Sequence, residues 1–447
     1  MILKFSCIIK KEIMKPFMNI SIVGTGCVGL STGAGFAKMG HRVICMDIDK
    51  NKVERINAGD IPIYEPGLNE VIRECRKKNM FEATSDLEHA VMNSDVSFIC
   101  VPTPEKKNGD CDLSFIENVC KNIGKILGEK EGYHVVVIKS TVPPETTERT
   151  VIPILEEYSG KNAGTDFGVC MNPEFLREGS ALQDFLNPDR IIIGEFDKRS
   201  GDVVERAYRR FDAPIVRTQL RVAEMIKYAS NAFLAMKITF ANEMGNICKR
   251  LGIDVYEVMK GVAFDKRISP YFLRAGVGFG GSCFRKDLRS IIAKAEKLGY
   301  DARLLKEVIS INEMQPLRIV DLLRKRTGSL KGKCIAVLGL AFKPDTDDIR
   351  DAPSIAVVSE LLRNGAKVKA YDPKAMFNFR KMFSEIEYCE SAREALKGAN
   401  ACLILTEWKE FRELTDDDFS LMTERIVIEG RKALNPLKVR DFEGICW

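Results

Sequence analysis

Short apolar runs recur along the first part of the chain, separated by turn-forming residues and by amphipathic stretches. The runs are too short for helices and rich in Val and Ile, so they predict buried strands of a parallel sheet. The predicted strands are Asn19–Val23, Arg42–Met46, Asp95–Val101, Val135–Lys139 and Phe167–Met171. Ligands bind at the carboxyl ends of strands in such sheets, so the loops after these runs are candidate site segments.

The pattern changes near residue 219 to a long, mostly apolar helix. It is predicted over Gln219–Leu251 and ends at Gly252, as a glycine C-cap would. At 1.5 Å per residue its length is roughly 50 Å, enough to span between domains. One polar stripe, Glu224, Lys227 and Asn231, interrupts the apolar surface at i, i+3, i+7 spacing. The stripe faces either solvent or an active site, and the wide apolar surface suggests a partner subunit.

Strand and helix patterns return in the last third of the chain. The predicted elements are helices between Leu288 and Leu323, strand Cys334–Leu340, helix Ser354–Arg363, strand Lys367–Tyr371 and strand Ile426–Glu429. This second α/β unit resembles the first in topology but has no glycine triplet after its first strand. A nucleotide would need other contacts there, and Lys343 and Arg350 are the obvious phosphate or ribose ligands.

These patterns predict an α/β protein with two Rossmann-like, doubly wound parallel-sheet domains. A long central helix and a helical middle domain join them, and 447 residues are too many for one ordinary core. We expect a disordered extension over 1–17, the first sheet domain over 18–212, the helical domain with a cysteine loop over 213–327, and the second α/β domain over 328–447. Translation beginning at Met1 or at Met18 fits this division equally well.

Composition narrows the function classes. Hydrophobic residues make up 45% and charged residues 29%, as in globular proteins, and the formal charge of +5 is small. With no long basic block, nucleic acid is not an expected partner, and no apolar run approaches membrane-spanning length. The 14 cysteines lie in apolar runs without metal-knuckle spacing, and there are three histidines. We therefore expect a reduced, cytoplasmic protein without a metal site.

A glycine-rich turn follows the first strand. Gly24, Gly26 and Gly29 open a helix that runs to about Met39, a pattern that places a pyrophosphate on the helix N-terminus. The next strand ends at Asp47, where a carboxylate can hold a ribose 2′-hydroxyl and would repel a 2′-phosphate. This favours NAD over NADP. Lys52 is either a phosphate contact or a solvated helix residue.

A second glycine-rich stretch carries a cysteine. Gly276–Asp287 contains four glycines in six residues, then Cys283, Arg285 and Lys286. A helix beginning near Asp287 and the two cations would favour a nucleophilic thiolate. A glycine loop with a buried, inert cysteine fits the stretch equally well.

Two glutamates follow the fifth predicted strand. Glu174 and Glu178 are four residues apart, so a helical turn would place both carboxylates on one face. A solvated helix start explains the same spacing.

Several long motifs occur in the order that they have in one known family. They are the dinucleotide turn, Lys139–Pro143, Asn172–Leu176, the Lys227–Asn231 helix, Gly278–Cys283 and Ala341–Lys343. From about Asn19 nearly to the C-terminus, the chain resembles the UDP-glucose/GDP-mannose dehydrogenase family. Ile61–Leu68 and Ser282–Phe284 are most similar to its UDP-glucose branch.

The resemblance implies a four-electron oxidation with NAD as cofactor and a nucleotide sugar as substrate. The C6 hydroxyl of UDP-glucose is oxidised to an aldehyde, Cys283 captures it as a thiohemiacetal, and a thioester then hydrolyses to UDP-glucuronate. The implied roles are water positioning and oxyanion stabilisation for Lys227 and Asp287, orientation for Asn231, proton transfer for Thr141 and thioester hydrolysis for Glu174. No histidine lies in any motif.

The resemblance also implies the binding residues. Those expected for the cofactor are Gly24, Gly26, Val28, Gly29, Asp47, Lys52, Thr103, Thr141, Glu178 and Arg350. Those expected for the nucleotide sugar are Glu174, Phe175, Leu176, Lys227, Asn231, Arg267, Phe279, Gly280, Phe342, Lys343 and Arg431. The family dimer implies a homodimer or higher homo-oligomer, with Arg431 reaching the neighbouring subunit's site. Domain 18–212 would bind NAD, and 328–447 the nucleotide sugar.

The chain departs from the family pattern at one position beside the thiol, and other functions also fit the sequence. Many relatives have proline where this chain has Arg285, and the charge would either lower the pKa of the thiol or change the loop geometry. The same chemistry on UDP-N-acetyl-hexosamine or GDP-mannose is an alternative. A two-electron hydroxyacid dehydrogenase would need neither the cysteine nor the second α/β domain. An NAD-binding redox sensor would not need Glu174, Lys227 or Asp287.

Overall fold

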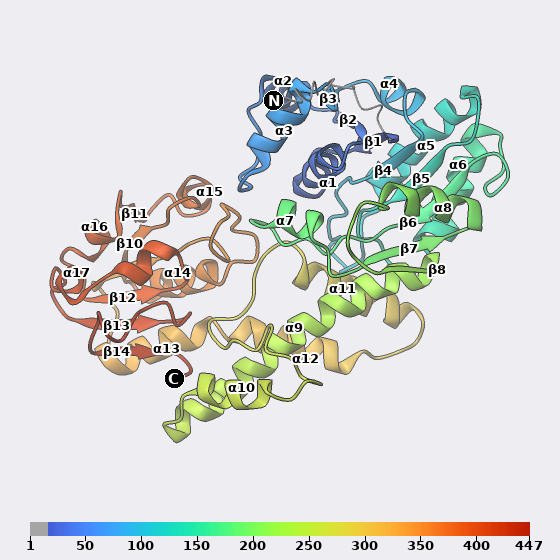
Figure 1. The fold of residues 1–447 in the computed structure, drawn as a ribbon. Helices are drawn as coiled ribbons and strands as arrows, with labels where there is room; N and C mark the ends of the chain where they lie inside the picture. The colour runs from blue at the N-terminus through green and yellow to red at the C-terminus, as the bar shows by residue number, and fades with distance from the viewer. Residues whose placement is uncertain (1–16) are drawn as a thin grey trace, which may run out of the picture.

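The computed structural model describes residues 17–447, and residues 1–16 of the expected extension lie outside this part of the chain. The first α/β unit, blue to green in Figure 1, and the second, orange to red, lie on opposite sides of the molecule. The helices of the central segment run from one unit toward the other. The predicted fold class is therefore confirmed.

The first sheet has the order β3-β2-β1-β4-β5-β6-β7-β8. Its strands are β1 (Asn19–Val23), β2 (Arg42–Met46), β3 (Phe81–Thr84), β4 (Val96–Ile99), β5 (Val135–Ile138), β6 (Gly168–Met171), β7 (Ile191–Glu195) and β8 (Ile215–Gln219). All neighbours are parallel except β6 and β7, which pair antiparallel. The sequence patterns did not predict β7 and β8, and β8 carries this sheet beyond residue 212.

Helices cover both faces of this sheet, which explains its near-continuous apolar strands. They are α1 (Cys27–Lys38), α2 (Lys50–Ala58), α3 (Leu68–Lys77), α4 (Leu87–Met92), α5 (Ser114–Glu129), α6 (Ile152–Ser159) after a π-helical turn (Thr147–Val151), α7 (Ala181–Leu186) and α8 (Lys198–Ala207). Side chains alternate between two cores: Val135 and Val137 belong to one, Val136 and Ile138 to the other.

The central helices are α9 (Leu220–Leu251), α10 (Val255–Ala263), α11 (Phe284–Lys297), α12 (Arg303–Met314) and α13 (Leu317–Thr327). The long helix is thus confirmed, and Gly252 ends it in the left-handed conformation, with φ 70°. The polar stripe Glu224, Lys227 and Asn231 is buried, so it does not face solvent. Helix α11 begins at Phe284, with Cys283 as its N-cap. This start lies three residues before the predicted one at Asp287.

The second sheet has the order β11-β10-β9-β12-β13-β14, and all its neighbours are parallel. Its strands are β9 (Cys334–Leu338), β10 (Lys367–Tyr371), β11 (Glu387–Tyr388), β12 (Ala401–Ile404), β13 (Ile426–Glu429) and β14 (Phe442–Gly444). The helices are α14 (Pro353–Arg363), α15 (Met376–Arg380), α16 (Ala392–Leu396), a 3₁₀ turn (Lys409–Glu413) and α17 (Asp416–Phe419). Its core is continuous with residues of α9, α10 and α13, so the helical segment packs on the second unit.

Candidate active site

The glycines of the turn after β1 have different reasons to be glycine. Gly24 has φ 104°, and a Cβ there would lie 2.7 Å from the carbonyl oxygen of Cys100. A Cβ on Gly29 would lie 1.9 Å from the carbonyl oxygen of Gly24. A Cβ on Gly26 would meet no atom within 4 Å, and Gly26 is exposed at the N-terminus of α1. The first and third glycines thus close the turn, and the second leaves room for a pyrophosphate.

Asp47 ends β2 beside this turn. It accepts hydrogen bonds from the backbone N–H of Thr25 (2.9 Å) and from its hydroxyl (2.5 Å). Burial opposes ionisation of Asp47, but the bonds from Thr25 and Asp49 and the charge of Lys52 outweigh burial and lower its pKa. An ionised, half-buried carboxylate at this place can accept ribose hydroxyls, so the turn and Asp47 fit NAD.

A buried ion pair links the first sheet to the long helix. Lys227 Nζ lies 2.9 Å from Glu174 Oε1, and the two side chains are 4% and 8% exposed. Burial opposes the charge on Lys227, but Glu174, Cys283 and Asp287 together raise its pKa. Burial likewise opposes the charge on Glu174, but the nearby charge of Lys227 outweighs burial, so the pKa of Glu174 is lowered. Both groups are therefore ionised, and the cation also faces the thiol.

Cys283 and Asp287 lie on the first turn of α11, opposite the polar stripe of α9. Solvent reaches Cys283, yet the surrounding atoms limit hydration of its thiolate and raise the pKa of the thiol, while Lys227 lowers it. Asp287 Oδ2 accepts a hydrogen bond from Asn231 (2.6 Å), and its Oδ1 pairs with Lys286 (2.7 Å). Five predicted catalytic residues, Cys283, Lys227, Asp287, Asn231 and Glu174, thus lie in one network.

The second α/β unit packs directly on the cysteine loop. A Cβ on Gly280 would lie 2.4 Å from the carbonyl oxygen of Asp351, and one on Gly281 would lie 2.8 Å from the ring of Phe342. The Gly281 N–H donates to the carbonyl of Arg350 (2.8 Å). Glycine is therefore required here because another backbone and an aromatic ring approach closely.

Arg431 also contacts this loop, within its own chain. Its Nη2 donates to the carbonyl oxygen of Gly278 (2.7 Å), and its Nε lies 3.8 Å from Glu407. In this single chain Arg431 thus follows β13 beside the cysteine loop of its own subunit, and its expected reach into a neighbouring subunit stays a prediction. Arg267 takes no part in these contacts: its side chain is exposed and pairs with Asp265.

Glu174 and Glu178 do not share a helical face. Residues 172–179 form a loop, because the N–H groups of Leu176, Arg177 and Gly179 donate to side-chain carboxylates (Glu174, Asp184 and Glu65) and not to carbonyls of a preceding helical turn. Glu174 points to Lys227, whereas Glu178 contacts the second unit: Thr346 donates to Oε1 (3.3 Å) and Arg350 lies 3.8 Å from Oε2. Burial and the nearby Asp348 raise the pKa of Glu178 to about 7.

The remaining predicted residues occupy loops around these groups. The Phe175 ring lies 3.6 Å from the Arg190 guanidinium and 5.5 Å from Lys227 Nζ, and the Leu176 N–H donates to Glu174. Thr103 and Thr141 follow β4 and β5, and Lys343 donates to the carbonyl oxygen of Glu178. Arg285 pairs with Glu313 and Asp351, so its charge is not directed at the thiol.

Sequence patterns missed the residues that hold the cysteine loop from outside. Asn312 and Gln315 of the α12 end, and Asn242 of α9, hydrogen-bond its backbone. They belong to no motif, so only their spatial position identifies them. Glu224 of the polar stripe has another role: it accepts bonds from the N–H groups of Glu145 and Thr147 and fastens the segment after β5 to α9.

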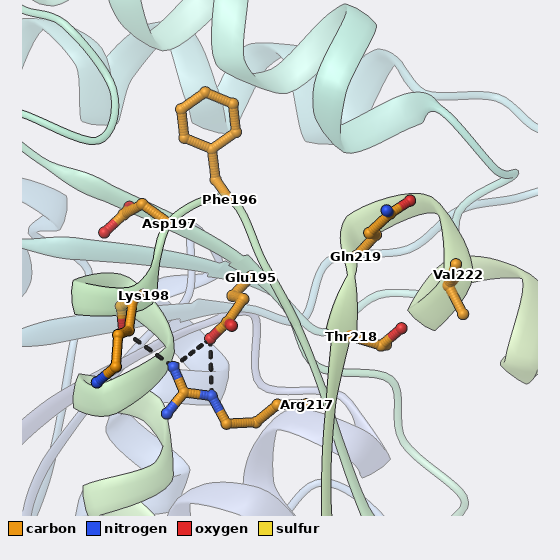
Figure 2. Close-up of a pocket in the computed structure, with 8 residues that line it drawn as sticks. All are labelled: Glu195, Phe196, Asp197, Lys198, Arg217, Thr218, Gln219 and Val222. Carbon is orange, nitrogen blue, oxygen red and sulfur yellow. Dashed lines mark hydrogen bonds and ion pairs between the residues drawn. The ribbon is translucent and has the colours of Figure 1, made fainter.

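A surface hollow of about 490 Å³ lies elsewhere, between β7, β8 and the start of α9 (Figure 2). Arg217 in this hollow pairs with Glu195 and donates to the carbonyl of Lys198 (3.0 Å), so its charge is already compensated. Among residues 17–447, no cluster of His, Cys, Asp and Glu could hold a metal ion, and no helix is long and apolar enough to cross a membrane.

The turn and Asp47, together with the buried network beside an accessible thiol, place the chain among NAD-dependent oxidoreductases. Comparison with known families defines the group more closely. Three domains of the UDP-glucose/GDP-mannose dehydrogenase family match: the NAD binding domain over 18–212, the central domain over 221–314 and the UDP binding domain over 336–436. The chain belongs to this family. The matches include the cysteine loop and the second unit, neither of which a two-electron hydroxyacid dehydrogenase needs.

Individual relatives agree with this assignment. The chain is 45% identical to the UDP-glucose 6-dehydrogenase AglM of Haloferax volcanii, over 96% of this chain and 100% of that protein. It is 42% identical to a GDP-mannose 6-dehydrogenase of Pseudomonas syringae, over 90% and 88% of the two chains. The solved UDP-glucose dehydrogenase from Pyrobaculum islandicum superposes with a TM-score of 0.91 at 41% identity, covering 96% and 98% of the two chains.

Proposed function

We propose that the protein oxidises the C6 hydroxyl of UDP-glucose to the carboxylate, forming UDP-glucuronate. The observation that carries this proposal is the position of Lys227, whose charge interacts with Glu174, Cys283 and Asp287 together. One cation thus serves a thiol, a carboxylate and a developing oxyanion. UDP-glucose 6-dehydrogenases at 41–45% identity support the choice of sugar.

The chain's own residues divide the reaction between them. Bound NAD⁺ would supply the hydride acceptor for both oxidations, that of the alcohol to the aldehyde and that of the thiohemiacetal to the thioester. In the first, the hydroxyl proton passes to a water held by Lys227 and Asp287 and from there to solvent, and Thr141 supports this transfer. The Cys283 sulfur then forms a bond to the aldehyde carbon, and the carbonyl π electrons move to oxygen, where Lys227 and Asn231 stabilise the charge.

Thioester hydrolysis requires a group that takes a proton from water. Glu174 suits this role because Lys227 keeps it ionised within a buried site. Water adds to the thioester carbon, the carbon–sulfur bond breaks, and the thiol of Cys283 regains its proton. Asp287, fixed by Asn231 and Lys286, keeps the water in place.

The binding residues follow the same division of domains. The turn from Gly24 to Gly29, Val28 included, with Asp47, Lys52, Thr103 and Thr141, would bind NAD, with Glu178 and Arg350 at its far side. The nucleotide-sugar site would be lined by Phe175, Leu176, Phe279, Gly280, Phe342, Lys343 and Arg431. Phe279 and Gly280 belong to the Cys283 loop, Phe342 and Arg431 pack on it, and Phe175 lies near Lys227. Arg267 would contact the nucleotide sugar only where a second subunit brings the two together.

We further propose a homodimer and a cytoplasmic location. Helix α9 presents exposed apolar side chains, Met225, Phe233, Phe240 and Ile247, that a second copy would cover. The cysteines among residues 17–447 are free thiols, which suits a reducing compartment.

A panel of nucleotide sugars tests the substrate. We expect kcat/KM for UDP-glucose to exceed the values for GDP-mannose and the UDP-N-acetyl-hexosamines, with NAD⁺ as oxidant. A Cys283→Ser variant should bind UDP-glucose but form no UDP-glucuronate. Preference for another sugar would overturn the choice of substrate, and full turnover by Cys283→Ser would overturn the thiol mechanism.

A further inference from the structure

Side chains from two helices bond the backbone that leads to Cys283. The Gly276 N–H donates to Asn242 Oδ1 (2.7 Å), and the Gly276 carbonyl accepts from Gln315 Nε2 (2.8 Å). Gln315 is fully buried and is itself held by Asn246 of α9 (2.9 Å). The loop that carries the thiol therefore has a fixed starting point.

Asn312 is the closest of these anchors to the thiol along the chain. Its Oδ1 accepts from the Phe279 N–H (2.8 Å), and its Nδ2 donates to the Phe279 carbonyl (3.0 Å). The amide thus pairs with one residue as a neighbouring β-strand would. Gly278 has φ 96°, and a Cβ there would lie 2.8 Å from Asn312 Oδ1, so the loop backbone is shaped around this side chain.

The same end of α12 also holds the chain after the thiol. Glu313 pairs with Arg285 (2.9 Å), and Arg285 reaches Asp351 of the second unit (3.2 Å). Residues 312, 313 and 315 therefore contact the segment both before and after Cys283. Such a two-sided attachment limits movement of the sulfur between α9 and the second unit.

We propose that Asn312 is a positioning residue that sets the place of the Cys283 sulfur through its two hydrogen bonds to Phe279. The proposal rests on the proposed function, in which Cys283 captures the aldehyde. The Arg285–Glu313 pair assists from the other side, so the arginine acts on loop geometry.

The position of the Cys283 sulfur should change the number of NADH molecules formed per sugar. The carbon–sulfur bond forms only if the sulfur meets the aldehyde carbon before the aldehyde leaves. A displacement near 1 Å can slow such a step about 100-fold. Escaped aldehyde has yielded one NADH, whereas captured aldehyde yields two. The sulfur would also move away from Lys227, so its thiolate would lose a stabilising charge.

The test compares Asn312→Ala and Asn312→Asp with the unmodified enzyme. NADH formed per limiting UDP-glucose is measured with excess NAD⁺ and with hydroxylamine present to trap free aldehyde. For Asn312→Ala we expect the ratio to fall from near two toward one, and kcat to fall about 10- to 100-fold. Asn312→Asp keeps the acceptor for the Phe279 N–H but sets its other carboxylate oxygen against the Phe279 carbonyl oxygen, so we expect the ratio to fall at least as far as in Asn312→Ala.

A second readout needs no substrate. The rate of Cys283 alkylation by iodoacetamide is followed from pH 6 to 10 by mass spectrometry, and we expect the midpoint to shift upward in both variants. Ser310→Ala, on an exposed position of the same helix, is the matched control and should match the unmodified enzyme in both readouts.

The possible failures are distinct. If both Asn312 variants keep a trapped ratio near two and the unmodified alkylation profile, the positioning role is overturned. If the unmodified enzyme forms no NADH from UDP-glucose, the proposed function fails instead, and the alkylation profiles still decide the role of Asn312.

Discussion

The first six strands of the first α/β unit and the six strands of the second have the same order, but the carboxylate after the second strand has different partners in the two units. In each, the second strand in sequence ends at an aspartate, Asp47 after β2 and Asp372 after β10. Asp47 is half-buried and bonds only Thr25 and Asp49 among the described residues. Asp372 is fully buried, and its Oδ2 accepts from the N–H groups of Leu340 (2.7 Å) and Ala341 (3.0 Å).

This difference shows that the Rossmann-like topology alone does not make a dinucleotide site. In the second unit the backbone N–H groups of the turn after β9 already occupy Oδ2 of Asp372. Trp408 Nε1 is a third donor to the same oxygen (3.0 Å). The long segment 339–352 then reaches outward, where Phe342 and Asp351 pack on the cysteine loop. The first unit leaves its turn open for a ligand, and the second uses its turn to build the site.

The largest expected effect is a loss of stability when the charge of Asp372 is removed. Its Oδ1 also accepts two backbone N–H groups, Lys374 and Ala375 (both 2.8 Å). In Asp372→Asn an amide NH₂ would face these donors, at a cost of about 2–4 kcal/mol. Thermal unfolding should show a lower Tm, while the KM for NAD⁺ stays unchanged. A raised KM with an unchanged Tm would mean that the second unit binds the dinucleotide.

Separating the second unit from the cysteine loop should chiefly lower turnover. In Gly280→Ala the new methyl group would collide with the carbonyl of Asp351, so the loop must shift. We expect kcat to fall about 100-fold, with NAD⁺ binding preserved in a fluorescence titration. Gly261→Ala is the control, since a Cβ there meets no atom within 4 Å. Unchanged kcat in Gly280→Ala would contradict the dependence of the thiol on the second unit.

The matching change in the first unit should affect cofactor binding instead. Asp47→Asn removes the charge that accepts ribose hydroxyls, and we expect the KM for NAD⁺ to rise about tenfold, or about 1.4 kcal/mol. Tm should change little because Asp47 is half-buried. Stability loss as large as that of Asp372→Asn would remove the distinction between the two aspartates.

The smallest expected effect concerns pH and the contact between the units. Burial, then Asp348, raises the pKa of Glu178 to about 7 from an ordinary value of 4.5. The folded state thus holds the proton more tightly, so stability falls as pH rises from about 4.5 to 7 and stays reduced above that range. Glu178→Gln should flatten this part of a Tm–pH curve. Glu224 and Glu429, whose pKa values burial also raises to about 7, should preserve part of the slope.

Local patterns predicted much of this molecule. Strands β10 and β13 and the long helix follow from apolar runs and a glycine cap. The stripe Glu224, Lys227 and Asn231 was expected to face either solvent or an active site, and its burial excludes solvent. The thiol was found through its glycines. Each of these features is determined by residues that lie close together in the sequence.

Other features depend on distant segments. The Glu174–Glu178 spacing suggested a helical face. The segment is a loop instead, because the carboxylates of Asp184 and Glu65 accept its N–H groups, and the two glutamates have different partners. The direction of Arg285 depends on Glu313 and Asp351, which no spacing rule connects to it. Asn312 pairs with a backbone 33 residues earlier in the chain.

The central claim is a four-electron oxidation that passes through Cys283. The most direct measurement is the amount of NADH formed per limiting UDP-glucose with excess NAD⁺, with the sugar product identified by mass spectrometry. The account predicts a ratio near two, with UDP-glucuronate as the product. A ratio near one, with an aldehyde as the final product, would contradict it.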